Sequence, residues 1–265
     1  SMRALRSELL IAVDHEGGRV QRFTGRPFTQ LPSMRSLGAL WDSDPEAARR
    51  TAYRHGQTIA RELIAHGVDF SFAPVLDLDW GRCSVIGDRA FHADPVVVAD
   101  LAGHLVRGLA AKGAPAVAKH FPGHGHVDAD SHHLLPVDPR SLDTILRHDL
   151  VPFAALIAQG IEAIMPAHVL YPSVDTRPAG FSPVWLGDVL RRRLGFDGLV
   201  FSDDLEMAGA QSAGDIVARA DAAVAAGCDA VLVCNDFDAM DDVLTRWQPP
   251  PQPDLGKRYA RMSRR

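Results

Sequence analysis

The stretch LVFSDDLEMAGAQSAGDIVARADAAVAAGCDAVLVC, residues 199–234, decides the fold of this 265-residue chain. Two short apolar runs, 199–203 and 230–234, flank a longer amphipathic stretch over 212–226. Strands joined through a helix lie parallel in one sheet, because a parallel connection needs a dozen or more residues. The stretch therefore predicts a β-α-β unit whose sheet is covered by helices on both faces.

The same alternation runs along the whole chain. Strands are expected over residues 9–14, 68–76, 116–120, 163–168, 199–203 and 230–234. Helices are expected between them, over about 45–66, 95–112, 141–158, 183–194 and 212–226. Several of these helices open on a typical start signal: Asp44-Pro45, Asp94-Pro95 or Ser182-Pro183. The fold class is therefore α/β, and a single α/β barrel of ~250 residues fits the length.

The domain organisation follows from what the chain lacks. It has no Gly/Ser-rich linker and no repeat of solenoid length, so we expect a single domain over residues 1–246. The stretch WQPPPQP, residues 247–253, is incompatible with a helix or a central strand. We expect residues 247–265 to be a Pro-rich segment and a short basic tail.

Composition excludes several classes of protein. With 28 Lys and Arg against 33 Asp and Glu, the net charge is −5, and no basic cluster suits nucleic acid. The three cysteines, Cys83, Cys228 and Cys234, show no CxxC spacing, which favours a reducing compartment and predicts a cytoplasmic protein. No apolar stretch reaches the ~18 residues that a membrane-spanning helix needs. We therefore expect neither a nucleic acid nor a membrane as partner.

Polar, ionisable residues follow nearly every expected strand. They are Asp14 and Glu16, Asp77 and Asp79, Lys119 and His120, His168, Asp203 and Asp204, and Asn235 and Asp236. A single acid after a strand is usually a helix cap. However, ligands of α/β barrels and open α/β sheets bind at the carboxyl ends of the strands. The recurrence of such residues therefore predicts a site at one mouth of the fold.

The densest group of ionisable residues is KHFPGHGHVDADSHH, residues 119–133. It opens on a strand end and continues through Pro and Gly into a loop, where catalytic residues concentrate. Asp130 and His132 stand two positions apart, so that the carboxylate can orient the imidazole and raise its basicity. Such a pair can transfer a proton near neutral pH. The alternative is a polar surface loop with incidental histidines.

Two further blocks carry candidate residues. In LVFSDDLEMAGA, residues 199–210, Asp203 or Asp204 can be a nucleophile or base, or else a helix cap, and the residues alone leave this open. In AVDHEGGRVQRF, residues 12–23, Asp14 ends a strand and a Gly-Gly turn follows. Neither a GxGxxG fingerprint nor a P-loop occurs, so dinucleotide and ATP binding lack support.

Histidines also raise the possibility of a metal. The His-rich loop over residues 120–133 and His168 can supply imidazole ligands, and a metal-dependent hydrolase is therefore an alternative. The HExxH motif is absent, and the Gly and Pro spacing does not place two of these histidines one helical turn apart. We predict no metal site and no cofactor.

Seven segments of the chain carry a resemblance to a known family. In order, they are AVDHEGGRVQRF, FAPVLDLD, IGDRAFHADP, KHFPGHG followed by DADSH, IMPAHVLYPSVD, LGFDGLVFSDDLEM and AGCDAVLVCN. They resemble the bacterial β-N-acetylglucosaminidases of glycoside hydrolase family 3, the cytoplasmic type that recycles cell-wall fragments. The resemblance covers nearly the whole chain, although His15 stands where many relatives have Gln.

The resemblance implies a role for each matching position. Asp203 looks like the nucleophile that forms a covalent glycosyl-enzyme, and His132 looks like the acid/base with Asp130 as its partner. A histidine acid/base departs from the two-carboxylate rule of most glycosidases. The implied sugar-binding positions are Asp14, Arg22, Arg89, Lys119 and His120.

The implied activity is that of a retaining exo-glycosidase. Its substrate would be a small muropeptide that carries terminal β-1,4-linked N-acetylglucosamine (GlcNAc) on an anhydromuramyl unit, and the enzyme would act as a monomer, with a dimer as the alternative. A catalytically silent sugar-binding protein is a further alternative. The implied fold is a (β/α)₈ TIM-type barrel. Six strands are found and eight are needed, so we expect that about two N-terminal strands are absent from this chain. We expect either that a partner chain or an irregular closure replaces them, or that the active enzyme carries a further N-terminal segment.

Overall fold

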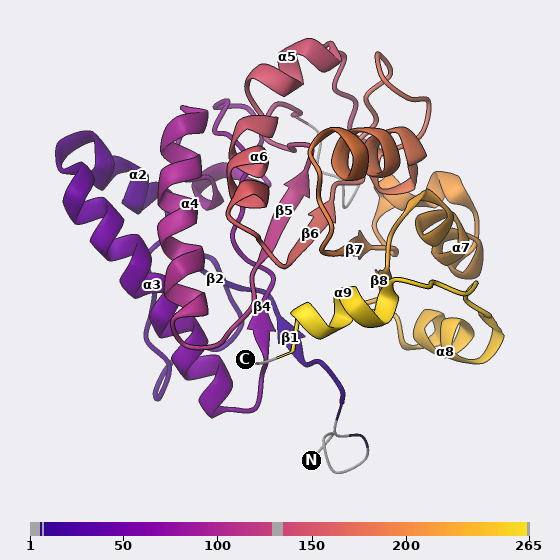
Figure 1. The fold of residues 1–265 in the computed structure, drawn as a ribbon, viewed down its shortest axis with the longest axis horizontal. Helices are drawn as coiled ribbons and strands as arrows, with labels where there is room; N and C mark the ends of the chain where they lie inside the picture. The colour runs from indigo at the N-terminus through magenta and orange to yellow at the C-terminus, as the bar shows by residue number, and fades with distance from the viewer. Residues whose placement is uncertain (1–5, 7, 129–134, 264–265) are drawn as a thin grey trace.

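Parallel strands form the centre of the molecule. The computed structural model describes residues 6, 8–128 and 135–263. The strands follow one another in the order β1 (Ala12–Val13), β4 (Phe70–Ser71), β5 (Val117–Phe121), β6 (Ala163–Pro166), β7 (Leu199–Asp204) and β8 (Ala230–Leu232) (Figure 1). A parallel bridge between Val75 and Lys119 joins the chain after β4 to β5. All six expected strands are confirmed: four are shorter than expected, β5 is shifted by one residue, and β7 extends one residue further.

The series of strands is open in the part of the chain that the structure describes. There, β1 and β8 end the series and do not pair with each other. The parallel α/β architecture is confirmed, whereas the closed (β/α)₈ barrel and its two additional strands stay predictions. A short antiparallel hairpin that the sequence did not predict, β2 (His15–Gly17) with β3 (Val20–Gln21), follows β1.

The two longest helices match their predicted starts. These helices are α3 (Pro45–Ala65) and α4 (Pro95–Ala110). The side chain of Asp44 accepts a hydrogen bond from the N–H of Ala47, and that of Asp94 accepts one from Val96. Each cap satisfies a backbone donor that has no partner inside the helix.

The helix expected over 141–158 is wrong as one element, because the chain forms two. These are α5 (Leu142–Arg147) and α6 (Leu150–Ala158), and the backbone leaves the helical region at His148. The break accompanies a buried position for Asp149, whose carboxylate accepts hydrogen bonds from Trp80 and Arg140. A helix period alone does not reveal such a tertiary contact.

The remaining helical segments of the described residues lie along both halves of the chain. They are α2 (Met34–Ser43), η1 (Gly87–Arg89), η2 (Ala179–Phe181), η3 (Val184–Arg193), η4 (Ala208–Ala213), α7 (Ile216–Ala226), α8 (Phe237–Arg246) and α9 (Leu255–Arg261). The predicted helix over 183–194 is η3, which has π-type hydrogen bonding, and the one over 212–226 begins later, at α7. Among the described residues, no helix has the length and apolar character to cross a membrane.

Of three apolar clusters among the described residues, the two that involve the strands stabilise this arrangement. The larger one fills the space between the strands and the surrounding helices. The smaller one lies on the strands around Phe70, Phe72 and Phe201, whose rings pack edge to face or at a tilt. Met262, which follows α9, is fully buried in this smaller cluster.

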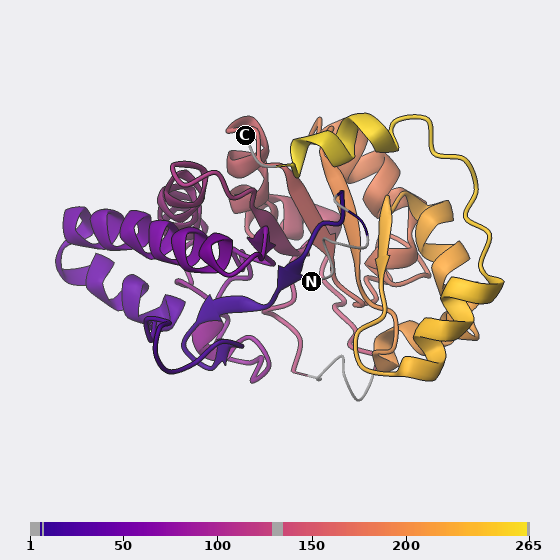
Figure 2. The same cartoon turned by 90° about the horizontal axis from the view of Figure 1, so that it is seen from below.

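The C-terminal segment therefore packs against the amino ends of the strands. Arg258 of α9 contacts Asp229, which precedes β8, and Arg261 donates hydrogen bonds to the carbonyls of Gly160 and Ile161 before β6. Figures 1 and 2 show α9, in yellow, beside these strand ends. The domain boundary at residue 246 stays a prediction, but the segment beyond it covers the base of the strands.

Candidate active site

A cavity of about 290 Å³ opens at the carboxyl ends of the strands. Six of the eight predicted site residues line it: Asp14, Arg22, Arg89, Lys119, His120 and Asp203. The wall also includes apolar side chains: Val20, Phe72, Val85, Ile86, Met165, Met207 and Leu232. The convergence predicted from the strand ends is thus observed, and a small polar ligand would meet both charged donors and apolar surface.

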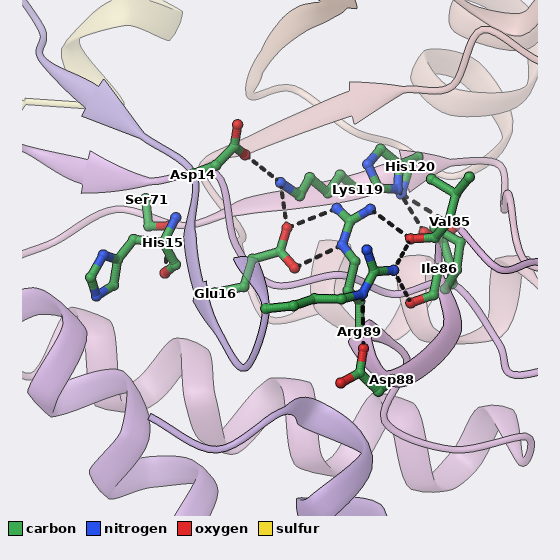
Figure 3. Close-up of polar contacts among 12 residues, drawn as sticks. Asp14, His15, Glu16, Ser71, Val85, Ile86, Asp88, Arg89, Lys119 and His120 are labelled. Atoms are coloured by element: carbon green, nitrogen blue, oxygen red, sulfur yellow. Dashed lines mark hydrogen bonds and ion pairs between the residues drawn. The ribbon is translucent and has the colours of Figure 1, made fainter. Parts of the chain in front are cut away.

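Four charged side chains form what we call the cavity cluster: Asp14, Glu16, Arg89 and Lys119 (Figure 3). The Lys119 ammonium contacts Asp14 Oδ1 at 2.7 Å and Glu16 Oε1 at 2.8 Å. Arg89 donates from Nε and Nη2 to the two carboxylate oxygens of Glu16, at 2.9 and 2.8 Å. The two acids balance the two cations, so the cluster is neutral although it is largely buried.

These pairings hold the carboxylates in their ionised form. Burial alone would raise the pKa of Glu16, but the positive charges of Lys119 and Arg89 outweigh it and lower the pKa to about 2. For Asp14, burial also opposes ionisation, and Lys119, Arg89 and Arg22 nevertheless lower the pKa below its ordinary value. Near neutral pH the cavity cluster therefore keeps fixed charges of known sign.

A second acid fixes His120. The buried carboxylate of Asp77 lies 2.6 Å from His120 Nδ1 and accepts a hydrogen bond from the backbone N–H of His124 at 2.7 Å. Since a carboxylate accepts here, the His120 Nδ1 must carry the proton, whether or not the ring is charged. Burial would raise the pKa of Asp77, but the charge and hydrogen bond of His120 lower it. His120 is thus held in one orientation at the cavity wall.

The loop that carries Arg89 is fastened by Arg19. The Arg19 guanidinium donates to the carbonyl of Ser84 at 3.1 Å and to that of Val85 at 2.5 Å, and its Nε donates to Asp88 at 3.0 Å. Figure 3 shows two of these partners, Val85 and Asp88, beside the cavity cluster. Arg22 lies at the exposed rim of the same cavity.

Asp203 lies at the carboxyl end of β7. It comes later in the chain than the other predicted residues that line the cavity. Its Oδ1 accepts a hydrogen bond from the backbone N–H of Asp204 at 2.8 Å. Burial and the nearby negative charges of Glu206 and Asp203 raise the pKa of Asp204 to about 6. The Glu206 carboxylate accepts backbone N–H bonds from residues 234, 235 and 236 and so ties the end of β7 to the segment after β8.

The other two predicted site residues, Asp130 and His132, lie outside the described residues. On their N-terminal side, Arg82 binds the Asp128 carboxylate with two hydrogen bonds, at 3.0 and 3.1 Å. On their C-terminal side, Arg140 pairs with the buried Asp138 and Asp149. The catalytic roles of this pair and of Asp203 stay predictions.

The described residues form no metal-binding site. In residues 8–128 and 135–263 no group of three or more His, Cys, Asp or Glu side chains is arranged to hold a metal ion. His120 and His124 lie near each other, but the nearest acid, Asp77, already accepts hydrogen bonds from both residues.

The sequence did not identify three residues that organise the site: Glu16, Arg19 and Asp77. Glu16 and Asp77 were recognised as acids that follow strands, which was the available signal. Their partners lie 43 to 103 residues away, from Asp77 and His120 to Glu16 and Lys119. Only the fold reveals such pairings.

The fold and the cavity define an α/β protein whose site lies at the carboxyl ends of parallel strands. Residues 2–252 match the family model described as the glycosyl hydrolase family 3 N terminal domain. The chain is 59% identical to a β-hexosaminidase of Chromobacterium violaceum over 263 residues, which are 99% of this chain and 73% of that protein. A β-hexosaminidase of Bordetella avium is 61% identical and covers 92% of this chain, which spans 70% of it.

Solved structures give the same result. NagZ from Neisseria gonorrhoeae, in complex with N-trifluoroacetyl-D-glucosamine, has a TM-score of 0.92 and 52% identity over 99% of this chain and 76% of its own. A family 3 β-N-acetylglucosaminidase from Paenibacillus has a TM-score of 0.83 and 36% identity, and covers 95% of this chain and 45% of its own. This chain belongs to glycosyl hydrolase family 3, and it is an enzyme of the β-hexosaminidase class. The family indicated by the sequence motifs is thus confirmed.

Proposed function

We propose that this enzyme is a retaining exo-β-N-acetylglucosaminidase. It removes a terminal β-1,4-linked GlcNAc from anhydromuramyl cell-wall fragments, with or without a peptide. The observation that carries the proposal is a single cavity that is lined both by Asp203 and by all five predicted sugar-binding residues. The β-hexosaminidase relatives and the glucosamine derivative bound to the gonococcal NagZ support the same substrate class.

The first chemical step is the formation of a glycosyl-enzyme. The Asp203 carboxylate attacks the anomeric carbon as the glycosidic bond breaks, and His132 donates a proton to the departing oxygen. Asp130 orients the His132 ring and stabilises its charged form. Asp203 lies at the cavity wall, where a carboxylate can approach the anomeric carbon.

The second step releases the sugar. Neutral His132 takes a proton from water, whose oxygen attacks the anomeric carbon and displaces the Asp203 carboxylate. Two displacements at the same carbon restore the original configuration, which is net retention. The residues return to their starting protonation states.

Three members of the cavity cluster, Asp14, Arg89 and Lys119, bind the sugar together with His120 and Arg22. Buried, paired cations retain donors of fixed direction, and such preorganised donors orient hydroxyl groups at a small cost in entropy. The apolar wall of Val85, Ile86 and Met207 offers a surface for the methyl group of the acetamide. We further propose that a monomer performs this reaction in the cytoplasm, which agrees with the low cysteine content.

The first experiment compares release of p-nitrophenol from the β-N-acetylglucosaminide and from the β-glucoside. The proposal expects a strong preference for the acetamido sugar, and equal rates would overturn the assignment. The rate is expected to be the same with and without a chelator, since the proposed steps use no metal; a loss of activity in chelator would favour the metal-dependent hydrolase.

A second experiment identifies the nucleophile. A mechanism-based fluoro-sugar is expected to label Asp203, as read by mass spectrometry of proteolytic peptides. A label on Asp204 would refute the assignment, because the two side chains are neighbours and both line the cavity.

A further inference from the structure

Glu16 is a buried acid at the centre of the cavity cluster. Its side chain is 3% exposed and does not line the cavity, whereas Arg89 and Lys119 do. The Glu16 carboxylate accepts two hydrogen bonds from Arg89 and contacts the Lys119 ammonium at 2.8 Å. Glu16 therefore contacts both cations (Figure 3) without lining the cavity itself.

The backbone at Glu16 is fixed by its surroundings. His55 of α3 lies with Nε2 at 2.7 Å from the Glu16 carbonyl. The next residue, Gly17, has φ of +118°, and a Cβ there would approach the carbonyl oxygen of Pro32 to 2.6 Å. On the other side, the Ser71 hydroxyl bonds both backbone groups of His15. These contacts fix the backbone at Glu16. From this backbone the Glu16 side chain extends toward Arg89 and Lys119.

The two cations depend on Glu16 to different degrees. Lys119 has a second carboxylate, Asp14, at 2.7 Å. For Arg89, Glu16 is the carboxylate in contact among the described residues, and the other contact is the Val85 carbonyl at 3.3 Å. A buried cation without a paired acid is costly, so loss of the Glu16 charge forces one or both side chains to move.

We propose that Glu16 is a positioning residue, which sets the spacing and direction of Arg89 and Lys119 for the bound sugar without touching it. The inference rests on the proposed function, because it takes Arg89 and Lys119 as sugar-binding residues. Arg89 donates to both carboxylate oxygens of Glu16, so either orientation of a glutamine amide turns its N–H₂ group toward a donor nitrogen of Arg89. In one of the two orientations the N–H₂ group also faces Lys119. The isosteric change therefore disturbs the pair while leaving the volume almost unchanged.

The test compares Glu16→Gln with Glu62→Gln. Glu62 is a matched control, because it is also buried and supports the same N-terminal segment, accepting from the N–H of Thr29 at 2.9 Å and from its hydroxyl at 2.6 Å. Glu62 does not line the cavity. Both variants are expected to unfold at a lower temperature than the wild type, so unfolding alone does not separate the two roles.

Kinetic measurements distinguish a positioning role from a purely structural role. Glu16→Gln is expected to lower kcat/KM for the p-nitrophenyl β-N-acetylglucosaminide by about 10- to 100-fold, mainly through a higher KM, while Glu62→Gln stays within about twofold. The dissociation constant of free GlcNAc, measured by calorimetry, should rise in parallel for Glu16→Gln. Unchanged kinetics and binding in Glu16→Gln, or equal losses in the two variants, would overturn the inference.

A double-mutant cycle shows whether Glu16 acts through Arg89. In an Arg89→Ala background, the further loss caused by Glu16→Gln should be smaller than in the wild type, because one of its partners is already gone. Losses that simply multiply would contradict the inference. The proposed function fails separately, if the wild type shows no preference for the acetamido sugar.

Discussion

Two buried ion clusters lie at opposite ends of the same strands, and they differ in what they hold. The cavity cluster pairs two acids with two cations at the carboxyl ends, and three of its four members line a cavity. The second, which we call the base cluster, consists of Arg191, Asp229 and Arg258 at the amino ends. One acid there accepts from two cations and from a backbone N–H.

The partners of each cluster explain the difference. The Asp229 carboxylate accepts hydrogen bonds from η3, from the start of β7 and from α9. These contacts hold the three elements together. The cavity cluster joins the ends of β1 and β5 to the loop at Arg89, and it directs side chains into open space. In α/β folds of this kind, the carboxyl ends of the strands carry function and the amino ends carry stability. Burial and pairing alone therefore do not distinguish a functional ion cluster from a structural one.

Asp203→Ala gives the largest expected effect at the carboxyl end. Loss of the nucleophile should lower kcat by about 10⁴-fold or more, because removal of a group that acts only in the chemical step affects turnover directly. The measurement is hydrolysis of the p-nitrophenyl β-N-acetylglucosaminide, with thermal unfolding as the control for the fold. A variant that retains more than a tenth of the activity would break the assignment of this end of the fold to chemistry.

Asp229→Asn gives the matching effect at the amino end. Removing this charge leaves Arg191 and Arg258 without their shared acid, and we expect the free energy of unfolding to fall by about 3 kcal/mol. Urea unfolding measures this loss. Activity per folded molecule at 25 °C should match the wild type, because no member of the base cluster lines the cavity. A fall in kcat/KM without a fall in stability would reverse the roles of the two ends.

Asp77→Asn sharpens the comparison within the carboxyl end. An asparagine can present its N–H₂ group to His120 Nδ1 and thereby shift the ring proton to the other nitrogen. We expect kcat/KM to fall by about 10- to 100-fold, as is usual when the partner that orients a functional imidazole is lost. Asp79→Asn is the matched control, because Asp79 follows the same strand, pairs with Arg35 and lies outside the cavity. Equal effects from the two variants would argue for a general loss of local structure.

The sequence predicted the strands well because each one is a short apolar run with a polar end. It also predicted where the site lies, since Asp14, Lys119 and Asp203 end three of these runs. Helix starts at Asp44 and Asp94 were predictable because the capping interaction is local. Such local patterns are predictable because the interacting residues are neighbours in the sequence.

Long-range contacts set the limit of prediction. The break between α5 and α6 follows a buried contact of Asp149 with Trp80, 69 residues earlier. The importance of Glu16 depends on Arg89, 73 residues later. In the same way, the burial of Met262 requires knowledge of which strands meet at the base. None of these pairings has a signature in a single sequence.

The smallest expected effect is a change in the pH dependence of stability. Lowering the pH should weaken the support of the cavity cluster at the carboxyl end but leave the base cluster unaffected. Burial lowers the pKa of His55, which holds the Glu16 backbone, from its ordinary 6.5 to about 4. Because the folded pKa lies below that of the unfolded chain, unfolded molecules take up the proton first as the pH falls below 6.5. The free energy of unfolding should therefore decrease by up to about 1.4 kcal/mol per pH unit from this group alone, until about pH 4.

His55→Gln removes this titration and keeps an amide donor for the Glu16 carbonyl. Between pH 6.5 and 5, the stability of the variant should depend less steeply on pH than that of the wild type, as measured by urea unfolding at several pH values. This window lies above the range in which Glu16, with its lowered pKa, begins to lose its contribution. Asp229→Asn should leave this part of the pH dependence as it is in the wild type, because the variant retains His55, which lies outside the base cluster. An unchanged slope in His55→Gln would show that the acid sensitivity arises elsewhere than at the support of the cavity cluster.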